Sequence, residues 1–248
     1  MTTPVLEFRN VSKRFGAIHA LDEMDFALMP GEIVGLMGDN GAGKSTTVKL
    51  IAGNFQPTLG EILLDGRPTR FSDSLDARDQ GIEVVYQDLA LCDNLTAADN
   101  VFLGREIMRR FGPVRMLDYR AMADRAAALF AELKSETRPR DLVMMMSGGQ
   151  RQAVAIARTR LRDARIVLMD EPTAAISVRQ VAEVLDLIRS LRDRGISVIL
   201  VSHRMPDVFG VADRIAVLRR GELVASKPTA NSTPEEVTGL ITGAIEAA

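Results

Sequence analysis

The chain has 248 residues, of which 46% are hydrophobic and 26% are charged, so it is long enough to bury a substantial core and has the composition of a globular protein. Its net charge of −2 excludes a general attraction to nucleic acid or to anionic lipid, and no apolar run is long enough to span a bilayer. The lone cysteine, Cys92, excludes an internal disulfide, and His19 and His203 lack metal-ligand spacing, so a metal site built on protein side chains alone is not expected.

The first part of the chain is predicted to form strands. Residues 5–11 alternate loosely between apolar and polar side chains, residues 18–28 are strand-like, and residues 61–64 end at the turn pair Asp65-Gly66. These segments predict a β-rich N-terminal lobe.

A phosphate-binding loop is predicted at residues 38–45, which read GDNGAGKS and fit the spacing G-x-x-x-x-G-K-[ST]. A strand-like run at residues 33–37 precedes the loop and a helical segment follows it, so the loop lies where the N-terminus of a helix can face an anion. Backbone N–H groups would converge on phosphate oxygens, Lys44 would reach the outer phosphates, and the Ser45 hydroxyl would ligate Mg²⁺. This context disfavours the alternative, a glycine-rich turn with a solvated lysine.

The middle of the chain is predicted to be mostly helical. Residues 73–80 and 96–134 are rich in alanine. Within residues 119–134, the apolar side chains that share one helical face are Met122, Ala126, Leu129 and Leu133. Residues 134–140, which contain arginine and proline, end this helix.

The last part of the chain alternates strands and helices. The apolar runs at residues 166–169 and 196–201 are typical of parallel strands buried on both faces. A helix that stops at Gly195 joins them, and its apolar stripe consists of Val181, Leu185, Ile188 and Leu191. A hairpin turn is expected at residues 219–221 and a final helix from Thr233. The whole pattern predicts an α/β fold: a P-loop nucleotidase core with a β-rich N-terminal lobe and an inserted α-helical subdomain.

Two carboxylates, Asp170 and Glu171, come at the carboxyl end of the strand at residues 166–169, where open α/β sheets bind their ligands. Asp170 is suited to hold the Mg²⁺ shell, and Glu171 is suited to orient or deprotonate the attacking water. Taken alone, the pair also fits a polar strand end before Pro172. Together with the phosphate loop, it predicts nucleotide hydrolysis.

A second anion site is predicted at Ser147-Gly148-Gly149-Gln150, which precedes a helical segment at residues 151–161. A serine and two glycines at a helix start leave backbone N–H groups free to face an anion. In isolation, a simple helix cap with a flexible turn explains the same residues.

Taken together, these motifs resemble those of the ATP-binding subunit of an ABC transporter, and the resemblance covers essentially all 248 residues. Five motifs occur in the order usual for that family: the phosphate loop at residues 38–46, Gln87 in VVYQD, MSGGQ at residues 146–150, IVLMDE ending at Glu171, and His203 in VSHR. The resemblance implies that nucleotide is bound by Gly38, Asp39, Asn40, Gly41, Ala42, Gly43, Lys44, Ser45 and Thr46 and by the signature residues Ser147, Gly148, Gly149 and Gln150.

The resemblance also implies roles for three residues that are ambiguous when judged alone. Phe15 would stack on adenine with little discrimination among bases, although a core aromatic at a strand edge would look the same. Gln87 would contact Mg²⁺ or the attacking water and relay the nucleotide state, although alone it is an ordinary polar strand end. His203 would contact the γ-phosphate, although a histidine that ends a strand is more often a satisfied buried residue. The implied catalytic residues are Glu171, His203 and Gln87, and the implied Mg²⁺ ligands are Ser45, Gln87 and Asp170.

Two copies of the chain are implied to pack head to tail, so that residues 147–150 of one copy cap the γ-phosphate held by Lys44 of the other. Bound ATP would favour the closed dimer, and hydrolysis would let it open and move the helical insert against membrane helices. The expected cofactors are ATP and Mg²⁺. The expected partners are transmembrane permease subunits, a second copy of the chain and, indirectly, a periplasmic sugar-binding protein, with no nucleic acid. The expected location is peripheral, at the cytoplasmic face of the inner membrane.

Three stretches resemble the monosaccharide importers of this family: residues 53–66, 81–106 and 196–224. That subgroup often carries two fused ATPase domains, whereas one is present here, so a homodimer is expected. The single domain is predicted to cover residues 1–248, with its core at residues 1–88 and 156–248 and its helical subdomain at residues 89–155.

Other functions fit the sequence less well. A soluble ABC-type ATPase that acts on nucleic acid or ribosomes usually has tandem domains or basic stretches, and a nucleotide-dependent regulator without a permease has usually lost Glu171 or His203. A different P-loop enzyme, such as a small-molecule kinase, would not need the segment SGGQ.

The chain departs from the family pattern at three places, none of which removes a catalytic group. Met146 replaces the usual leucine of the signature and conserves its volume. Ile176 stands before Ser177 where leucine is usual, and Thr159-Arg160 replaces a pair of small apolar residues. Packing would suffer if Arg160 faced the core and would change little if it reached the surface.

Overall fold

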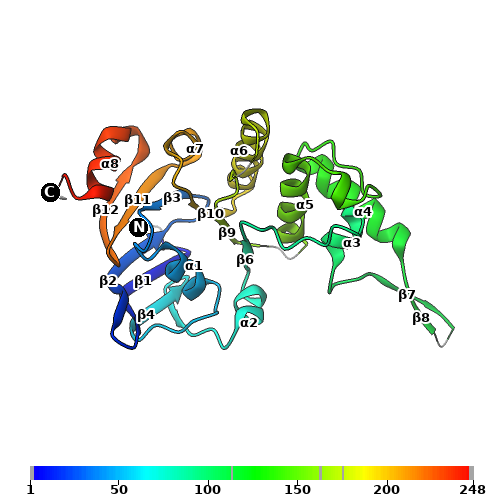
Figure 1. Ribbon diagram of the computed structural model, residues 1–248. Coiled ribbons are helices and arrows are strands. Elements are labelled where there is room, and N and C mark those ends of the chain that lie inside the picture. Colours follow the sequence, from blue (N-terminus) through cyan, green and yellow to red (C-terminus); the bar gives the residue numbers. More distant parts are fainter. Residues whose placement is uncertain (1–2, 113, 162–163, 175, 246–248) are drawn as a thin grey trace. The chain divides into compact units, whose positions relative to one another are not determined.

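The computed structural model describes residues 3–112, 114–161, 164–174 and 176–245 (Figure 1). The chain divides into two compact units. The first unit consists of Met1–Val84, Ala164–Glu171 and Leu191–Ala248, and the second of Val85–Asp163 and Pro172–Ser190. The predicted helical subdomain, residues 89–155, falls within the second unit, and its boundaries remain a prediction.

A six-stranded sheet carries most of the first unit, in the order β12-β11-β3-β10-β9-β6. Its strands are β3 (Ile33–Gly38), β6 (Ile82–Val85), β9 (Ile166–Asp170), β10 (Ser197–Val201), β11 (Arg214–Arg219) and β12 (Glu222–Pro228). β3 runs parallel to β10 and β11, β10 runs parallel to β9, and β12 is antiparallel to β11. Every residue of β3 and β10 is buried, as expected for parallel strands that are covered on both faces.

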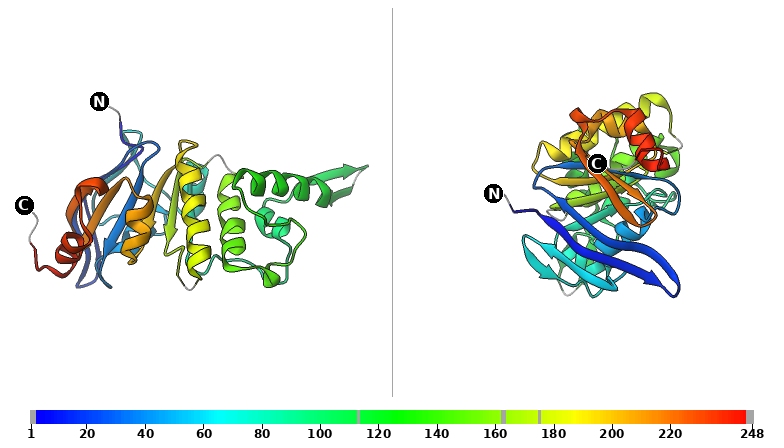
Figure 2. Two further views of the ribbon diagram at one scale, coloured as in Figure 1. Left: turned by 90° about the horizontal axis from the view of Figure 1, so that it is seen from above. Right: turned by 90° about the vertical axis from the view of Figure 1, so that its left-hand side faces the viewer.

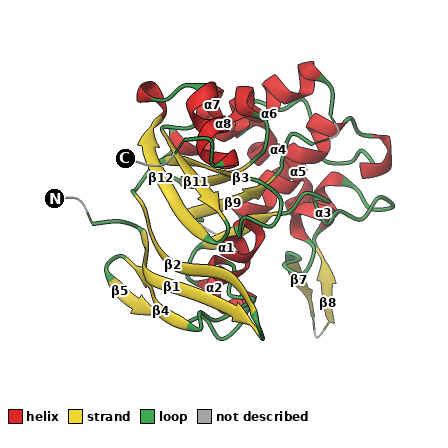
Figure 3. Cartoon of the chain, turned by 60° about the vertical axis from the view of Figure 1, so that its left-hand side comes forward, coloured by secondary structure: helices red, strands yellow, loops and turns green. Residues whose placement is uncertain are grey.

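A four-stranded antiparallel sheet forms the predicted β-rich lobe of the same unit, in the order β2-β1-β4-β5 (Figure 3). It contains β1 (Leu6–Phe15), β2 (Ile18–Leu28), β4 (Leu59–Leu64) and β5 (Arg67–Thr69). β1 continues beyond the predicted residues 5–11. The prediction ended too early because register shifts in the pairing with β2 break the alternation of side chains along the strand. At the predicted turn, Asp65 and Gly66 have φ values of 50° and 74°, as a two-residue hairpin turn requires.

Short helices complete the first unit: α1 (Lys44–Ile51), α2 (Ser74–Asp79), α7 (Met205–Val211) and α8 (Pro234–Thr242). α1 packs on β2, β3 and β9, and α8 packs on β11. Both sheets and α1 contribute to the apolar core, whose members include Phe8, Leu36, Ile51, Leu168 and Ile199. As predicted, Thr233 caps the final helix by accepting a hydrogen bond from the N–H of Glu236.

The second unit contains helices and one hairpin. Its elements are α3 (Ala97–Phe102), β7 (Met108–Phe111), β8 (Val114–Leu117), α4 (Tyr119–Glu132), α5 (Gly148–Arg160) and α6 (Val178–Arg192), whose last two residues lie in the first unit. α3, α4 and α5 pack against one another. The predicted apolar face is buried at Met122, Ala126, Leu129 and Leu133. The prediction of a mostly helical insert is wrong at β7 and β8, which form an antiparallel hairpin. Arginines and apolar residues are mixed on both faces of this hairpin, so the period of two is hidden in the sequence.

The β9–α6–β10 crossover agrees with the prediction. In chain order, α6 comes between β9 and β10, which pair in parallel. Gly195, at φ 80°, follows the last turn of α6. Across the described residues, no helix combines the length and the apolar character that crossing a membrane requires.

Candidate nucleotide-binding site

The phosphate loop joins the end of β3 to the start of α1 in the first unit. Gly38 and Gly43 have φ values of 156° and 109°, which residues with a Cβ rarely adopt. A Cβ at Gly38 would also lie 2.3 Å from Leu218 O, and one at Gly43 would lie 2.8 Å from Ala20 O. The glycines therefore permit a tight turn into the N-terminus of α1, where the helix dipole favours an anion.

Lys44, the first residue of α1, reaches back over the loop. Its Nζ donates hydrogen bonds to Gly38 O at 2.7 Å and to Asp39 O at 2.9 Å. Burial lowers the pKa of Lys44, and the negative charges of Glu171, Asp39 and Asp170 oppose this effect. The ammonium group is thus held at the rim of the loop, in the electrostatic field of both predicted carboxylates.

Asp170 and Glu171 come at the end of β9. Burial raises the pKa of Asp170, and the charge of Glu171 raises it further, while Lys44 and Lys49 lower it. Glu171 has a φ of 49°, a left-handed conformation that is uncommon for a residue with a side chain, and its N–H donates to Val201 O at 2.9 Å. Such backbone strain is typical of functional sites.

His203 follows β10 and lies beside Glu171. Its Nδ1 is 2.9 Å from Glu171 Oε1, within hydrogen-bond distance. The His203 side chain is 63% exposed, whereas that of Glu171 is 23% exposed. The alternative of a satisfied buried histidine is therefore wrong, because the ring is held by Glu171 and is accessible to a ligand.

The charge balance at these carboxylates suits a divalent cation. Burial and repulsion by Glu171 raise the pKa of Asp170, against the opposing positive charges of Lys44 and Lys49. Ser45 is exposed in the first turn of α1, and this helix packs on β9. A hydroxyl and a carboxylate supply oxygen ligands of the kind that Mg²⁺ prefers. The residues present therefore fit Mg²⁺.

The raised pKa of Asp170 predicts a trade-off between function and stability. A carboxyl whose pKa is raised by folding destabilises the fold when it is ionised. Asp170→Asn removes the charge and conserves the shape, so we expect it to raise the midpoint of thermal unfolding of the nucleotide-free protein near pH 7. The gain should shrink as the pH falls towards about 4, where the wild-type carboxyl becomes protonated in both states. Calorimetry at several pH values measures this difference.

Asp213→Asn is the matched control. Asp213 accepts a hydrogen bond from Ile33 N at 2.8 Å and pairs with Arg192 at 3.2 Å, so its charge is compensated and its replacement should not raise the midpoint. A lower unfolding temperature for Asp170→Asn at every pH would contradict the stated cause of the pKa shift.

An aromatic cluster lies in the β-rich lobe of the first unit. Phe15, at the end of β1, is 41% exposed, so it is not a core residue. Its ring meets Phe55 edge to face, with ring centroids 5.2 Å apart. Lys13 Nζ lies 5.1 Å from the centroid of Phe15 and donates to Gln56 O at 2.8 Å. Phe55 and Lys13 were not predicted from the sequence. The place of Lys13, two residues before Phe15 in a strand, was an available signal.

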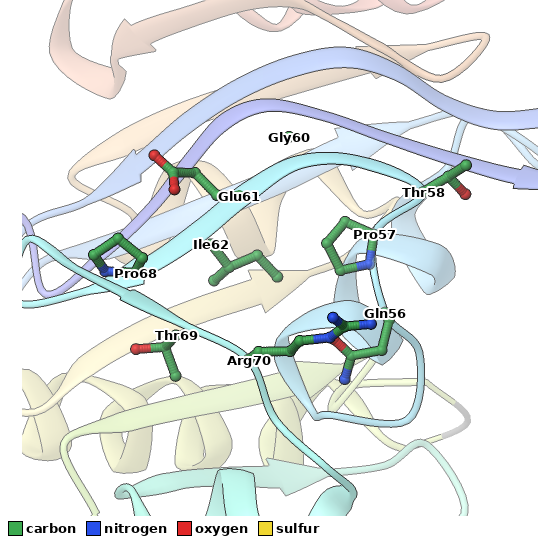
Figure 4. Close-up of a pocket in the computed structure, with 9 residues that line it drawn as sticks. All are labelled: Gln56, Pro57, Thr58, Gly60, Glu61, Ile62, Pro68, Thr69 and Arg70. Atoms are coloured by element: carbon green, nitrogen blue, oxygen red, sulfur yellow. The ribbon is translucent and has the colours of Figure 1, made fainter.

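A separate pocket of ≈ 400 Å³ lies in the same lobe and is lined by Gln56, Pro57, Thr58, Gly60, Glu61, Ile62, Pro68, Thr69 and Arg70 (Figure 4). Arg70 lies beside Gln56, with Nε 3.3 Å from Gln56 Oε1. None of the predicted nucleotide-binding residues lines this pocket, so it is distinct from the phosphate loop.

The signature segment begins α5 in the second unit. Ser147 Oγ accepts a hydrogen bond from Gln150 N at 3.3 Å, and Gln150 Oε1 accepts one from Ser147 N at 3.0 Å. This reciprocal cap holds the helix start in a defined conformation. The positive end of the helix dipole lies here, so the segment is suited to an anion.

Two departures from the family pattern have a structural explanation. A Cβ at Gly148 would lie 2.6 Å from Ile176 Cγ2, so the unusual isoleucine packs directly on a signature glycine. Arg160 is only partly buried, and its Nη2 lies 3.8 Å from Glu132 Oε2. Its Nε is buried and has no hydrogen-bond partner among the described residues. Arg160 is thus placed between core and surface, and one of its donors is unsatisfied.

The predicted site residues belong to both units. The phosphate loop, Asp170, Glu171 and His203 lie in the first unit, whereas Gln87 and residues 147–150 lie in the second. Gln87 is exposed, in the turn that follows β6.

Comparison with known proteins gives a consistent set of relatives. A family profile described as ABC transporter matches residues 21–174. The chain is 46% identical to the fructose import ATP-binding protein FrcA of Rhizobium meliloti, over 98% of this chain and 95% of that protein. It is 42% identical to the ribose import ATP-binding protein RbsA of Yersinia pestis, over 97% of this chain and 46% of that protein. The chain therefore spans nearly all of the fructose protein but about half the length of the ribose proteins that it matches.

Among solved structures, the chain resembles the dimeric post-hydrolysis state of the ATP-binding cassette MJ0796 bound to ADP and Pi. The TM-score is 0.73 at 28% identity, over 90% of this chain and 98% of that chain. The predicted α/β cassette fold is confirmed by this likeness.

Proposed function

This chain belongs to the ABC transporter family, as an ATP-binding subunit, and on that premise we propose that two copies of it hydrolyse ATP at a shared interface to power the import of a monosaccharide. The observation that carries the proposal is the arrangement in the first unit, where Lys44 lies in the field of Asp170 and Glu171, and Glu171 is 2.9 Å from His203. One structural unit thus supplies a phosphate-binding loop, a candidate base and a second polar group beside that base.

Each side chain has one task in the proposed reaction. The loop N–H groups and Lys44 bind the phosphates, while Phe15 stacks on adenine. Mg²⁺, held by Ser45, Asp170 and Gln87 when bound, would neutralise phosphate charge. Glu171 orients the attacking water and accepts its proton. Glu171 Oε1 accepts a hydrogen bond from His203 Nδ1 and so positions the imidazole, whose ring then contacts the γ-phosphate.

The second copy completes the site in this proposal. The capped start of α5, residues 147–150, favours an anion, so it is suited to cap the γ-phosphate bound by the other copy. The dimeric state of the similar cassette MJ0796 supports this arrangement.

Sugar import is supported by the relatives. The proteins named for fructose and ribose import match almost the full length of this chain. We therefore propose transmembrane permease subunits as direct partners, a periplasmic sugar-binding protein as an indirect partner, and a peripheral location at the cytoplasmic face of the inner membrane.

A mixing experiment tests the shared site. Ser147→Asp keeps a good helix cap but places a negative charge where the γ-phosphate would lie, and Lys44→Ala removes the phosphate-binding ammonium. Each variant alone should be inactive. When they are mixed, each heterodimer contains one intact site and one doubly altered site, so we expect ATPase activity to recover to about a quarter of the wild-type rate.

The recovery is specific to a site built from two copies. Ser147→Thr conserves both the cap and the neutral charge, and it serves as the control that should remain active alone. Absence of recovery at every mixing ratio would contradict the shared site, because two sites built within single copies cannot complement each other.

A further inference from the structure

The hairpin β7–β8 is a part of the second unit that the proposed nucleotide chemistry does not use. Residues 108–117 read MRRFGPVRML and contain three arginines and no acidic residue. Figures 1 and 2 show its two strands extending away from α3 and α4. Among the residues that the structure describes, the two strands pair with each other alone, as a separate two-stranded sheet.

The register of the hairpin places like charges opposite each other. Arg110 pairs with Arg115, and Arg109 pairs with Met116. Directly opposed side chains have Cβ atoms about 5 Å apart, so the guanidinium groups of Arg110 and Arg115 repel each other. All three arginines are exposed, and within the described ranges none of them has an ion-pair partner.

Apolar side chains lie exposed among these arginines. Met108, Val114 and Met116 are 41%, 55% and 48% exposed. An isolated two-stranded hairpin is marginally stable in water, and opposed like charges weaken it further. The hairpin therefore combines uncompensated positive charge with uncovered apolar surface, and an anionic, partly apolar surface would relieve both.

We propose that the β7–β8 hairpin docks on the headgroups of anionic phospholipids. The arginines bind lipid phosphates with charge-assisted hydrogen bonds, and Met108, Val114 and Met116 enter the boundary between headgroups and acyl chains. Because the whole chain has a net charge of −2, this attraction is local to the hairpin. The inference rests on the proposed function only in that the subunit works beside a membrane.

The distribution of side chains favours lipid over an acidic protein segment. Met108 shares a face with Arg110 and Arg115, whereas Val114 and Met116 share the opposite face with Arg109. A bound peptide would cover one face and leave the other bare. Headgroups surround an inserted ribbon and contact both faces.

The test is flotation of the purified chain with vesicles of phosphatidylcholine, alone or mixed with phosphatidylglycerol. We expect binding only to the mixed vesicles, and weaker binding as salt is added. Each arginine near an anionic surface contributes roughly a fivefold factor, so Arg109→Gln/Arg110→Gln/Arg115→Gln should lower the partition coefficient about a hundredfold.

The matched control is Arg67→Gln/Arg140→Gln/Arg179→Gln, which makes the same change in net charge at exposed arginines elsewhere. It should bind vesicles almost as well as the wild type. The ATP affinity of every variant is measured in the same preparations, so a failure of the proposed nucleotide chemistry is seen separately from a failure of lipid docking.

Three results would overturn the proposal. The first is that the hairpin variant binds the mixed vesicles as tightly as the wild type does. The second is that the wild type binds vesicles of phosphatidylcholine alone as well as it binds the mixed vesicles. In the third, the hairpin variant keeps vesicle binding but loses the stimulation of its ATPase by a co-purified permease, which assigns the hairpin to an acidic protein segment instead.

Discussion

Lys44→Ala is expected to lower the affinity for MgATP by at least ~100-fold, beyond the range of calorimetric titration. Lys44 Nζ lies on the carbonyl oxygens of Gly38 and Asp39, at the rim of the loop that would hold the triphosphate. Without the ammonium group, the phosphates would face Asp170 and Glu171 with less compensating charge. Each charge-assisted hydrogen bond contributes about 1.5–3 kcal/mol, so the loss of two such bonds to phosphate accounts for the expected effect.

Lys49→Ala is the matched control on the same helix. Lys49 lies exposed in the last turn of α1, and its Nζ is 5.5 Å from the centroid of Phe55. Its removal changes the net charge equally but leaves the phosphate loop intact, so the affinity should change little. Equal losses in both variants would assign binding to the general charge of α1, and an unchanged affinity in Lys44→Ala would refute the role of the loop.

Glu171→Gln is expected to keep ATP binding while slowing turnover by at least ~10-fold, because the amide cannot accept the proton of the attacking water. The substitution conserves the shape of a residue whose backbone is left-handed at φ 49°, and its Oε1 can still accept a hydrogen bond from His203 Nδ1. ATP should therefore persist and hold the two copies together. Size exclusion with MgATP should show a dimer that the wild type loses as it hydrolyses the nucleotide.

Glu61→Gln provides the comparison for this result. Glu61 is an exposed carboxylate of the same unit, 4.0 Å from Arg9, and it lines the separate pocket of the β-rich lobe and not the phosphate loop. Its turnover should equal that of the wild type. If Glu171→Gln also turns over at the wild-type rate, then Glu171 is not the base, and His203 becomes the group to test next.

Much of the first unit could be predicted because its signals are local. The phosphate loop depends on glycines at positive φ between an apolar strand and a helix. All of these features lie within residues 33–51, from the start of β3 to the end of α1. The turn at Arg220 and Gly221, with φ values of 52° and 91°, is equally local. By contrast, Gln87 and His203 could be assigned roles only through the family resemblance, since a single polar residue after a strand has no distinctive local pattern.

The hairpin β7–β8 shows where local signals fail. Its segment mixes arginine and apolar residues, so neither a helical nor a strand period stands out. Only the pairing register shows that Arg110 lies opposite Arg115.

The amino-acid sequence by itself determined the fold class, the phosphate loop and the pair of carboxylates at the end of β9. Only the tertiary structure decided that Glu171 contacts His203, 32 residues away, that Phe15 meets Phe55, and that burial raises the pKa of Asp170. These features depend on strand order and register. β9 lies beside β10 with Asp170 opposite Val201, and this adjacency brings the two strand ends together. Distances of this kind are set by packing among segments far apart in the chain, which neighbouring residues do not encode.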